Sequence, residues 1–179
     1  MTSSFKPPGA VRLQTRIIGV SEPARQCGRH HRHLPRVAGG LVGIEVIRAD
    51  SRWPVAWGII GRATARLLDV DGWLELTRSV CPAGAPPGCA SAILGAAARH
   101  AREAGDPIVT YTLASEPGTS LRAAGWVAVG MTRGGQHGRA GRPRAIRTAE
   151  LAGPKVRWVP PHVLPLALAR GWAAVEAAA

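Results

Sequence analysis

The sequence predicts a single α/β (α+β) domain, and three observations lead to this fold class. An apolar segment with strand character, Leu74–Val80, runs into a Pro/Gly-rich loop, Cys81–Gly88. The next segment, Cys89–Gly105, has the small-residue composition of a helix, and the apolar segment Pro107–Ala114 then has the pattern of a second strand. A chain of 179 residues is long enough for one hydrophobic core and short for two.

The segments before this unit predict a β-meander. Leu41–Ala49 and Val55–Thr64 have the apolar, β-branched character of strands, and Ala65–Asp69 is expected to continue the second of them. Nearer the start, residues 1–10 are expected to be loose and residues 11–28 to hold a strand or short helix. Ser21-Glu22-Pro23 is typical of a helix start, and that helix is expected to run into Arg25–His33.

The segments after the unit are less regular. Thr119–Ala124 is predicted as a short helix, Val127–Thr132 as the last strand, and Leu166–Ala179 as a C-terminal helix or a frayed tail. Arg133–Arg147 is a Gly/Arg/Pro-rich loop with five Arg and no acid. The predicted organisation is a loose N-terminus (1–10), a domain (11–132), a basic loop with a C-terminal extension (133–163) and an Ala-rich tail or helix (164–179).

The chain is strongly basic, with a formal net charge of +12 and a pI of about 11.5. This balance favours an anionic partner, with nucleic acid ahead of a membrane, although heavy use of Arg and Ala by a GC-rich genome gives the same composition. Cys27, Cys81 and Cys89 have no Cys-x-x-Cys spacing, which is typical of a reducing compartment. We find no signal-peptide pattern and no apolar run of about 18 residues, so a cytoplasmic protein without a membrane partner is expected.

A His-rich basic segment follows the predicted helix start. His30, His31 and His33 lie among several Arg residues. No carboxylate or Cys pair completes a metal-ligand set and the Arg residues repel a cation, so no metal is predicted. Two interpretations stay open: a basic surface helix, or a His that contacts substrate or moves a proton, for which His31 is the candidate.

The Pro/Gly-rich loop and the helix after it predict a site for a phosphate-bearing cofactor. The first amides of a helix lack intrahelical partners and carry partial positive charge, which suits a pyrophosphate. The loop thiols have no His partner in the sequence and are interpreted as small loop residues rather than nucleophiles. The residues predicted to bind the cofactor are Ser79, Val80, Cys81, Gly84, Gly88, Cys89, Ala90 and Ser91.

Two segments carry a resemblance to a known family. Gly88-Cys89-Ala90-Ser91-Ala92-Ile93-Leu94 resembles the acyl-CoA-binding segment of the GCN5-related N-acetyltransferases (GNATs), and Ser120–Trp126 resembles the helix-to-strand ending of that family. The resemblance spans about residues 41–132. It implies a GNAT-like central, mostly antiparallel sheet with a splay near Val80 and Ile108, and helices on both faces. It also implies acetyl-CoA or another acyl-CoA as cofactor, with the pantetheine arm along Thr77–Val80.

Two positions depart from the family pattern, and one subfamily stands out. Ala85 replaces the usual basic residue or Gln, and Leu121 replaces the Tyr that commonly acts as general acid. Within the superfamily the chain resembles the Mom-type phage enzymes that modify adenine in DNA. This resemblance rests on the Arg29–His33 cluster, the Leu74–Arg78 strand, and the step from Gly118-Thr119 to Arg122-Ala123. It implies acyl transfer to a nucleobase amine.

Glu75 is the candidate general base, since GNATs often place one about five residues before the phosphate loop. Period-2 alternation predicts Glu75, Thr77 and Ser79 on one face of the strand. A carboxylate in a partly desolvated cleft has a raised pKa and is suited to accept a proton from an amine. The alternatives are a Glu75 that pairs structurally with Arg78 or Arg62, and a Glu75 that is simply solvated.

Tyr111 and Ser115 are the candidate proton donors in place of Leu121. Tyr111 is the single Tyr of the chain, and either its hydroxyl is the donor or its ring is part of the core. Hydroxyls at the end of the same predicted strand would face the thioester. The further alternatives are Thr110, Thr112 and Ser120.

The basic segments predict DNA as a partner. Arg residues spaced by Gly and Pro are exposed, and they contact phosphates without reading the base sequence. Trp158 either stacks on an extruded base or caps the core. The predicted function is acyl-CoA-dependent N-acylation of a nucleobase amine. The alternatives are a GNAT that acts on a small-molecule or protein amine, a non-catalytic nucleic-acid-binding protein on a degenerate GNAT scaffold, and a structural phage component. The predicted nucleic-acid-binding residues are Arg29, Arg32, Arg139, Arg142 and Arg144.

Overall fold

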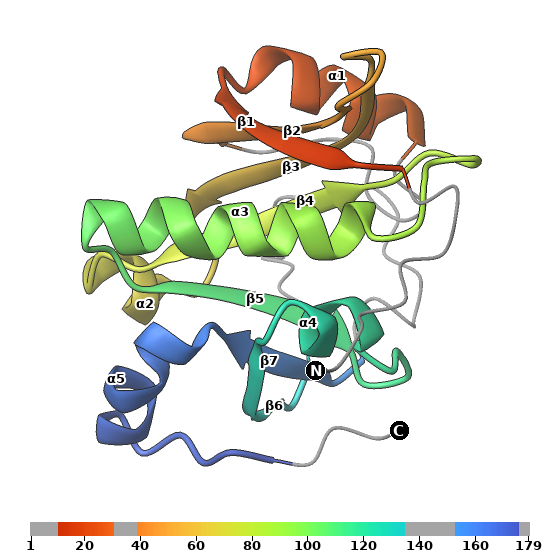
Figure 1. Cartoon of the computed structure of the whole chain (residues 1–179). Coiled ribbons are helices and arrows are strands. Elements are labelled where there is room, and N and C mark those ends of the chain that lie inside the picture. The colour runs from red at the N-terminus through yellow and green to blue at the C-terminus, as the bar shows by residue number, and fades with distance from the viewer. Residues whose placement is uncertain (1–10, 31–38, 135–152, 176–179) are drawn as a thin grey trace, which may run out of the picture.

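The computed structural model describes residues 11–30, 39–134 and 153–175, and these residues form one seven-stranded sheet with helices packed on it (Figure 1). The strand order is β1-β2-β3-β4-β5-β7-β6, and all neighbouring strands are antiparallel except β4 and β5. The strands are β1 (Leu13–Ile18), β2 (Val42–Arg48), β3 (Pro54–Arg62), β4 (Leu74–Val80), β5 (Ile108–Leu113), β6 (Val127–Thr132) and β7 (Lys155–Val159). The helices are α1 (Ser21–His30), α2 (Arg66–Val70), α3 (Cys89–Ala104), α4 (Thr119–Ala123), η2 (Pro161–Val163) and α5 (Leu164–Ala169).

The predicted meander and the strand–loop–helix–strand unit are confirmed, with one exception. The segment that was expected to continue β3 as a strand folds instead as α2, so that prediction is wrong. The amides of Leu68 and Asp69 both donate to the Ala65 carbonyl, at 2.9 and 3.0 Å. The helical turn buries Leu68 and leaves Leu67 exposed.

The splay between β4 and β5 is confirmed. The two parallel strands pair at only two positions, Leu74 with Ile108 and Glu75 with Val109. Beyond these pairs β5 turns away from β4, toward the end of the molecule where α3 begins (Figure 1). The Thr110 hydroxyl donates to the Leu76 carbonyl at 2.9 Å just past the last pair. The wedge therefore opens toward the carboxyl ends of both strands.

A strand that was not predicted lies in the second half of the sheet. β7 inserts between β5 and β6 and pairs with both, so the prediction of Val127–Thr132 as the last strand is wrong. Within β7, Val156 and Trp158 are buried, whereas Lys155 and Arg157 are half-buried. This period-2 alternation over the first four residues of β7 was the available sequence signal.

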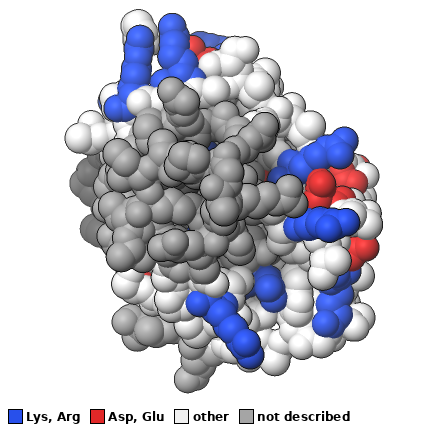
Figure 2. Space-filling model, turned by 180° about the vertical axis from the view of Figure 1, so that it is seen from behind, with Lys and Arg blue, Asp and Glu red and all other residues white. Residues whose placement is uncertain are grey.

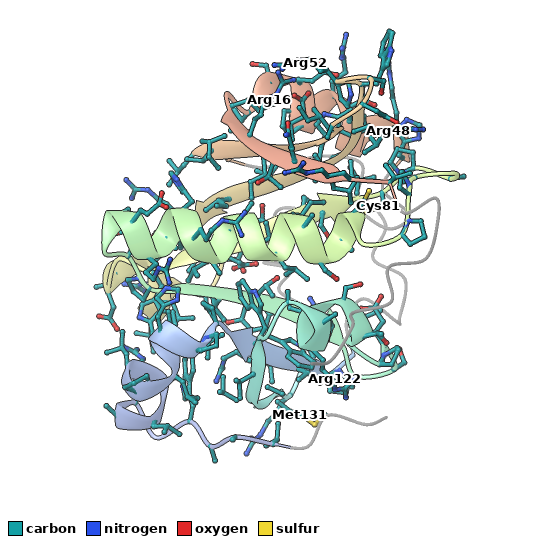
Figure 3. All side chains as sticks on the ribbon, in the orientation of Figure 1. Arg16, Arg48, Arg52, Cys81, Arg122 and Met131 are labelled. Atoms are coloured by element: carbon teal, nitrogen blue, oxygen red, sulfur yellow. The ribbon has the colours of Figure 1, made fainter. Side chains whose placement is uncertain are left out.

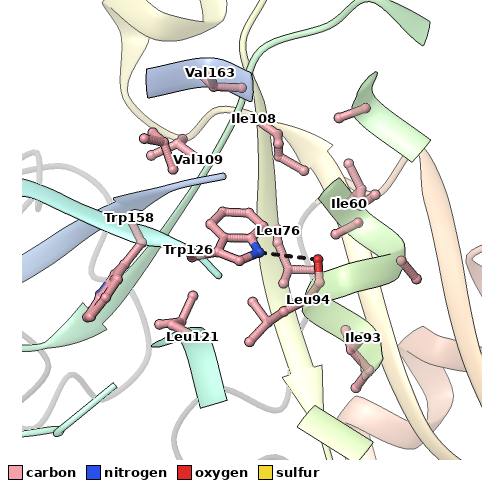
Figure 4. Packing of buried hydrophobic residues seen from close by; sticks show 14 of the residues in the cluster. Ile60, Leu76, Ile93, Leu94, Ile108, Val109, Leu121, Trp126, Trp158 and Val163 are labelled. Atoms are coloured by element: carbon pink, nitrogen blue, oxygen red, sulfur yellow. Dashed lines mark hydrogen bonds between the residues drawn. The ribbon is translucent and has the colours of Figure 1, made fainter. Parts of the chain in front are cut away.

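Helices cover both faces of the sheet, as expected. On one face, the apolar side of α3 packs on the first four strands, and the Trp126 indole N–H donates to the Leu94 carbonyl at 3.3 Å (Figure 4). On the other face, Cys27 of α1 packs against Trp57, Ile59 and Val80. The buried core extends without interruption from the strands to α3 and α4. This packing fixes the position at which α3 begins after the β4–α3 loop.

The C-terminal segment ties β7 to the loop before β4. The rings of Trp73 and Trp172 lie 5.1 Å apart, and Arg170 forms an ion pair with Asp71 at 2.6 Å. The Arg157 guanidinium lies 3.9 Å from the centre of the Trp172 ring. Among the described helices, none combines the length and the apolar character needed to cross a bilayer.

Basic side chains are distributed over the described surface rather than gathered in one stripe. On the face seen in Figure 2, Lys and Arg lie at several separate places, some of them beside acidic side chains. Several described Arg are in ion pairs. These pairs are Arg16–Glu45, Arg25–Glu22, Arg48–Asp50 and Arg170–Asp71.

Candidate functional site

A cleft of about 710 Å³ opens where β4 and β5 diverge. Its walls come from the end of α1, from β4 and β5, from the first turn of α3, and from the loop and helix after β5. Figure 3 shows Cys81 at the end of β4 and Arg122 on α4, on the two sides of this opening. The lining side chains that bear ionisable groups or hydroxyls are His30, Thr64, Glu75, Thr77, Arg78, Ser79, Cys81, Thr110, Tyr111, Thr112, Glu116, Thr119, Ser120 and Lys155.

A β-bulge interrupts β4 inside the cleft. Leu76 lies opposite Ile60 of β3, whereas Arg78 lies opposite Ile59. Thr77 is therefore an extra residue without a partner of its own in β3, and its hydroxyl donates to the Ile59 carbonyl at 3.2 Å. An extra residue of this kind shifts the alternation of all later side chains by one.

The bulge decides which β4 side chains share a face. Glu75 and Arg78 lie opposite β3 residues two positions apart, so both project from the sheet face that α1 covers. Ser79 falls on the opposite face. The prediction that Glu75, Thr77 and Ser79 lie on one face is therefore wrong, because simple alternation does not allow for the bulge.

The second half of the sheet contributes to the same face. Glu75 is in register with Val109, and Tyr111 lies two residues further along β5. In β7, Lys155 lies opposite Leu113, two residues beyond Tyr111. Because side chains two residues apart share a face, Tyr111 and Lys155 project from the same side of the sheet as Glu75. The fold thus collects a carboxylate, a phenol and two cations from three strands.

Glu75 is buried and held in place by one residue. Its side chain is only 7% exposed, and its Oε2 accepts hydrogen bonds from the Thr64 backbone N–H and hydroxyl, both at 2.8 Å. Burial raises the pKa of Glu75 above its ordinary value of 4.5, although the Thr64 hydrogen bonds and the charges of Arg78 and Lys155 act in the opposite direction. A buried carboxylate with a raised pKa is a better proton acceptor than an exposed one.

Tyr111 is half-buried beside Arg157. Burial raises the pKa of the phenol, and a hydrogen bond with Arg157 opposes that shift without reversing it. The Arg157 guanidinium lies 6.0 Å from the centre of the Tyr111 ring. The phenol therefore stays protonated at neutral pH and is a hydrogen-bond donor on the cleft wall.

The β4–α3 loop has the backbone needed to bind phosphate oxygens. Gly88 immediately precedes α3 with a φ of 88°, and Gly84 in the same loop has a φ of 83°. Gly is the residue that takes this left-handed conformation without strain. A 16-residue helix then begins, and its first amides point out of the helix end. Ala85 supplies no charge here, so the loop offers a phosphate its backbone amides alone.

The cysteines near the loop are not poised as nucleophiles. Local desolvation, followed by the neighbouring Cys89, raises the pKa of the Cys81 thiol to about 11. Burial also raises the pKa of Cys89. The reactive thiolate is therefore scarce at neutral pH, which agrees with their interpretation as small loop residues.

The structure places the predicted cofactor residues in two groups. Ser79, Val80, Cys81 and Ala90 line the cleft. The others lie beside it, in the loop and the first turn of α3. These are Gly84, Gly88, Cys89 and Ser91.

The other predicted residues have mixed placements. Glu75 and Tyr111 both line the cleft. Ser115 is exposed in the turn after β5 and does not line the cleft, whereas the alternative candidate Ser120 does. Arg29 is exposed on α1. Trp158 is 1% exposed and donates to the Thr112 hydroxyl at 2.9 Å, so it belongs to the core and does not stack on a base. His31, Arg32, Arg139, Arg142 and Arg144 lie outside the described residues.

Sequence reasoning missed three residues of the site. Thr64 was assigned to a strand without a role, Arg78 was considered only as a partner of Glu75, and Lys155 lies on the strand that was not predicted. Of the described His residues, His30 lines the cleft. Within residues 11–30, 39–134 and 153–175, no group of three or more His, Cys, Asp or Glu is arranged to hold a metal ion.

No family model and no curated protein matches the sequence, but solved structures match the fold. Polyamine N-acetyltransferase of Drosophila melanogaster aligns with a TM-score of 0.54 at 11% identity, over 83% of this chain and 99% of that one. A proposed GNAT-family acetyltransferase of Desulfovibrio desulfuricans aligns with a TM-score of 0.53 at 14% identity, over 82% and 97%. The NatC complex bound to Gag peptide and CoA contains a chain that aligns with a TM-score of 0.51 at 9% identity, over 83% and 98%. The chain therefore has the fold of the GNAT acetyltransferases.

Proposed function

We propose that the protein is an acyl-CoA-dependent N-acyltransferase of the GNAT type. The observation that carries the proposal is the position of Glu75. This buried carboxylate with a raised pKa faces a cleft between splayed strands, and the cleft begins beside the N-terminus of a 16-residue helix. A proton acceptor beside a phosphate-binding backbone is the arrangement that acyl transfer from CoA to an amine requires.

Acyl-CoA fits the cleft in two respects. The loop and first turn of α3 offer amides to the pyrophosphate. The part of β4 beyond Glu75 has no Cα partner in β5, so its edge is available to the amides of the pantetheine arm. When bound, the cofactor supplies the activated acyl group. The NatC complex, one chain of which has this fold, is bound to CoA.

The residues of the cleft then divide the proton transfers between them. A C–N bond forms between the acceptor amine and the acyl carbon, and the C–S bond to CoA breaks. Glu75 accepts the proton that the amine loses, directly or through one water. The Tyr111 hydroxyl, on the same face of the sheet, donates a proton to the departing sulfur. Tyr111 thereby replaces the general acid that Leu121 lacks.

The first test is a thermal-shift titration with acetyl-CoA. A ligand at about 100 times its Kd stabilises the native state by about 2.7 kcal/mol, so a clear rise in Tm is expected. ATP at the same concentrations is the control, because it carries phosphates without the pantetheine arm. Equal shifts with both ligands, or none with either, contradict the proposed cofactor site.

For the acceptor, our proposal is a nucleobase amine in DNA. It is supported by the net charge of +12 and by the resemblance to Mom-type phage enzymes. The test combines acetyl-CoA carrying a labelled acetyl group with adenine-containing DNA, and label on the base is the expected result. Label on an added amine such as agmatine, with none on DNA, contradicts it. DNA binding without CoA binding favours a nucleic-acid-binding protein on an inactive scaffold.

A salt titration tests the basic loop separately. Arg142 and Arg144 lie outside the described residues, and both are proposed to contact phosphates. Replacing both by Ala removes two phosphate contacts and should therefore reduce the slope of log K against log salt by roughly 1.8. An unchanged slope removes the loop from the interface.

A further inference from the structure

Tyr111 has a cationic partner on the neighbouring strand. Arg157 of β7 lies directly opposite Tyr111 of β5, and opposed side chains of an antiparallel pair share a face, with Cβ atoms about 4.5–5.5 Å apart. The guanidinium lies 6.0 Å from the centre of the Tyr111 ring and forms a hydrogen bond with the phenol. We propose that Arg157 is a positioning residue that orients the Tyr111 hydroxyl and stabilises the phenolate that remains after proton transfer. This inference rests on the proposed N-acyltransferase function.

An aromatic ring of the C-terminal segment holds the Arg157 guanidinium in place. The guanidinium lies 3.9 Å from the centre of the Trp172 ring, well within the range of a cation–π contact. Trp172 packs in turn on Trp73, with 5.1 Å between the ring centres. A guanidinium fixed by an aromatic ring loses less rotamer freedom when it also contacts the phenol. Arg157 is therefore preorganised beside Tyr111.

The Arg157 side chain has a hydrogen-bond donor to spare. Its Nε is buried without a hydrogen-bond partner, and among the described residues no carboxylate forms an ion pair with this guanidinium. A buried donor that lacks a partner costs free energy. Negative charge on the Tyr111 oxygen attracts the guanidinium, so the contact between the two side chains becomes stronger as the proton leaves.

Other charged groups also surround Tyr111. The Glu75 carboxylate of β4 raises the pKa of the phenol, in the same direction as burial, whereas Arg157 lowers it. Further ionisable groups come from β4, β7, α1, the loop after β5 and the C-terminal segment. These are Arg78, Lys155, His30 and Glu116 on the cleft wall, and Arg170 at 5.9 Å from the centre of the Trp172 ring. A variant that changes Arg157 alone keeps all of these groups and isolates its contribution.

The step that Arg157 assists moves one proton between two atoms. The O–H bond of Tyr111 breaks, an S–H bond forms on the departing sulfur, and the electron pair of the broken bond stays on the phenol oxygen. The phenolate takes a proton from solvent before the next turnover. Because the Arg157 cation is beside the phenol while the oxygen carries negative charge, it lowers the barrier to proton release.

The first experiment titrates Tyr111 directly in the full chain, without cofactor or acceptor. Tyr111 is the single Tyr, so tyrosine isotopically labelled at Cζ gives one NMR signal that follows the protonation of the phenol. Arg157→Gln removes a cation at hydrogen-bond distance and should move the pKa of the phenol upward by about one unit. Arg157→Lys keeps the charge and should stay closer to the wild type. An unchanged pKa in Arg157→Gln overturns the proposal.

Arg170→Gln is the matched control. It removes the other cation beside Trp172, together with its ion pair to Asp71, so it loosens the same segment and leaves Arg157 opposite Tyr111. It should lower stability and leave the pKa of the phenol unchanged. Equal pKa shifts in Arg170→Gln and Arg157→Gln would mean that the shift comes from the packing of the segment, which contradicts the proposal.

The second experiment measures kinetics with acetyl-CoA and whichever of agmatine and adenine-containing DNA the wild type acetylates. Arg157→Gln should lower kcat by about tenfold with little change in the KM for acetyl-CoA. Because the donor must be protonated, kcat falls as pH rises through the pKa of Tyr111, and in Arg157→Gln this limb should move to higher pH. In a Tyr111→Phe background, Arg157→Gln should cause no further loss. An equal loss of kcat in both backgrounds overturns the proposal.

The fate of the proposed function is measured separately. Protection by acetyl-CoA against thermal unfolding reports on the cofactor site alone. A shifted Tyr111 titration without that protection keeps the pair with Arg157 and removes the acyltransferase, and protection with an unshifted titration does the opposite. If Arg157→Gln fails to fold, Arg157→Lys decides, because it keeps the charge and loses the planar fork. Its kcat should fall while the pKa of Tyr111 stays near that of the wild type, and an unchanged kcat contradicts the positioning role.

Discussion

Strands β1 to β4 follow one another along the chain and each pairs with its predecessor, whereas β5, β7 and β6 pair out of sequence order. In the first group a short turn joins β2 to β3, α2 lies between β3 and β4, and α1 and residues 31–41 lie between β1 and β2. The second group includes β7, which is separated from β6 by 22 residues of sequence. Two residue pairs link the groups across the sheet. The candidate base Glu75 and its neighbour Arg78 belong to the first group, and Tyr111 and Lys155 belong to the second.

This difference shows how the site is assembled. Local contacts position the residues within each group. The distance between the proposed proton acceptor Glu75 and the proposed proton donor Tyr111 depends on how the two groups are held together. Besides the β4–β5 pairs, α3 contacts both β4 and α4, and the C-terminal segment joins β7 to the loop before β4. Changes in the two groups should therefore have different consequences.

The largest expected effect is on the chemistry of the first group. Glu75→Gln keeps the shape of the side chain and an acceptor for Thr64 but removes the base, so kcat should fall by about 10²- to 10⁴-fold. Acetyl-CoA affinity should be retained, and steady-state kinetics with a thermal-shift titration measures both. Glu45→Gln is the matched control, since Glu45 is a strand carboxylate with 5% exposure that does not line the cleft. Unchanged turnover in Glu75→Gln removes Glu75 as the base.

The next effect is on the packing of the second group. Trp158→Ala opens a cavity at a residue that is 1% exposed and should lower the free energy of unfolding by about 3–5 kcal/mol. Urea denaturation measures the loss. Trp53→Ala removes the same side chain where it is 72% exposed, and it should change stability by less than about 0.5 kcal/mol. Similar losses in both variants would mean that β7 does not complete the core.

A smaller effect is expected where the C-terminal segment joins the two groups. Trp172→Ala removes the ring contact with Trp73 and the cation–π contact with Arg157, a loss of about 1–2 kcal/mol. Trp172→Phe keeps an aromatic ring and should lose less. If both variants match the wild type in urea denaturation, the segment does not hold the groups together.

The smallest effect is a pH dependence of stability. The pKa of Glu75 is raised in the folded state, so its contribution is fully present below the unfolded value and is lost as pH rises through the folded value. The wild type should therefore lose stability relative to Glu75→Gln as pH rises above 4.5. Urea denaturation of both proteins from about pH 4 to about pH 8 measures the difference. A constant difference would indicate an ordinary pKa for Glu75.

The comparison also explains which parts of the site were predictable. The cofactor loop and α3 are continuous in sequence, and their Gly, Ala and apolar residues carry local signals that the fold follows. Glu75 was predictable because an acid in an apolar strand is unusual. Arg78 was not placed correctly, since a bulge depends on the pairing of β4 with β3 and leaves no composition signal. Lys155 was missed because four residues of alternation are too few to identify a strand beside a long Gly/Arg-rich segment.

The sequence alone determined the α/β class, the splayed strand–loop–helix–strand unit, the helix start that suits a pyrophosphate, and Glu75 as the candidate base. The order of the elements and the helix start follow from side-chain periodicity and backbone preferences, which act over a few residues. The splay and the role of Glu75 were implied by the resemblance to the GNATs. Only the tertiary structure decided that Glu75, Arg78, Tyr111 and Lys155 face one cleft, and that Trp158 is core. Strand register and the insertion of β7 set these positions, because they depend on contacts between segments as far apart as Tyr111 and Arg157.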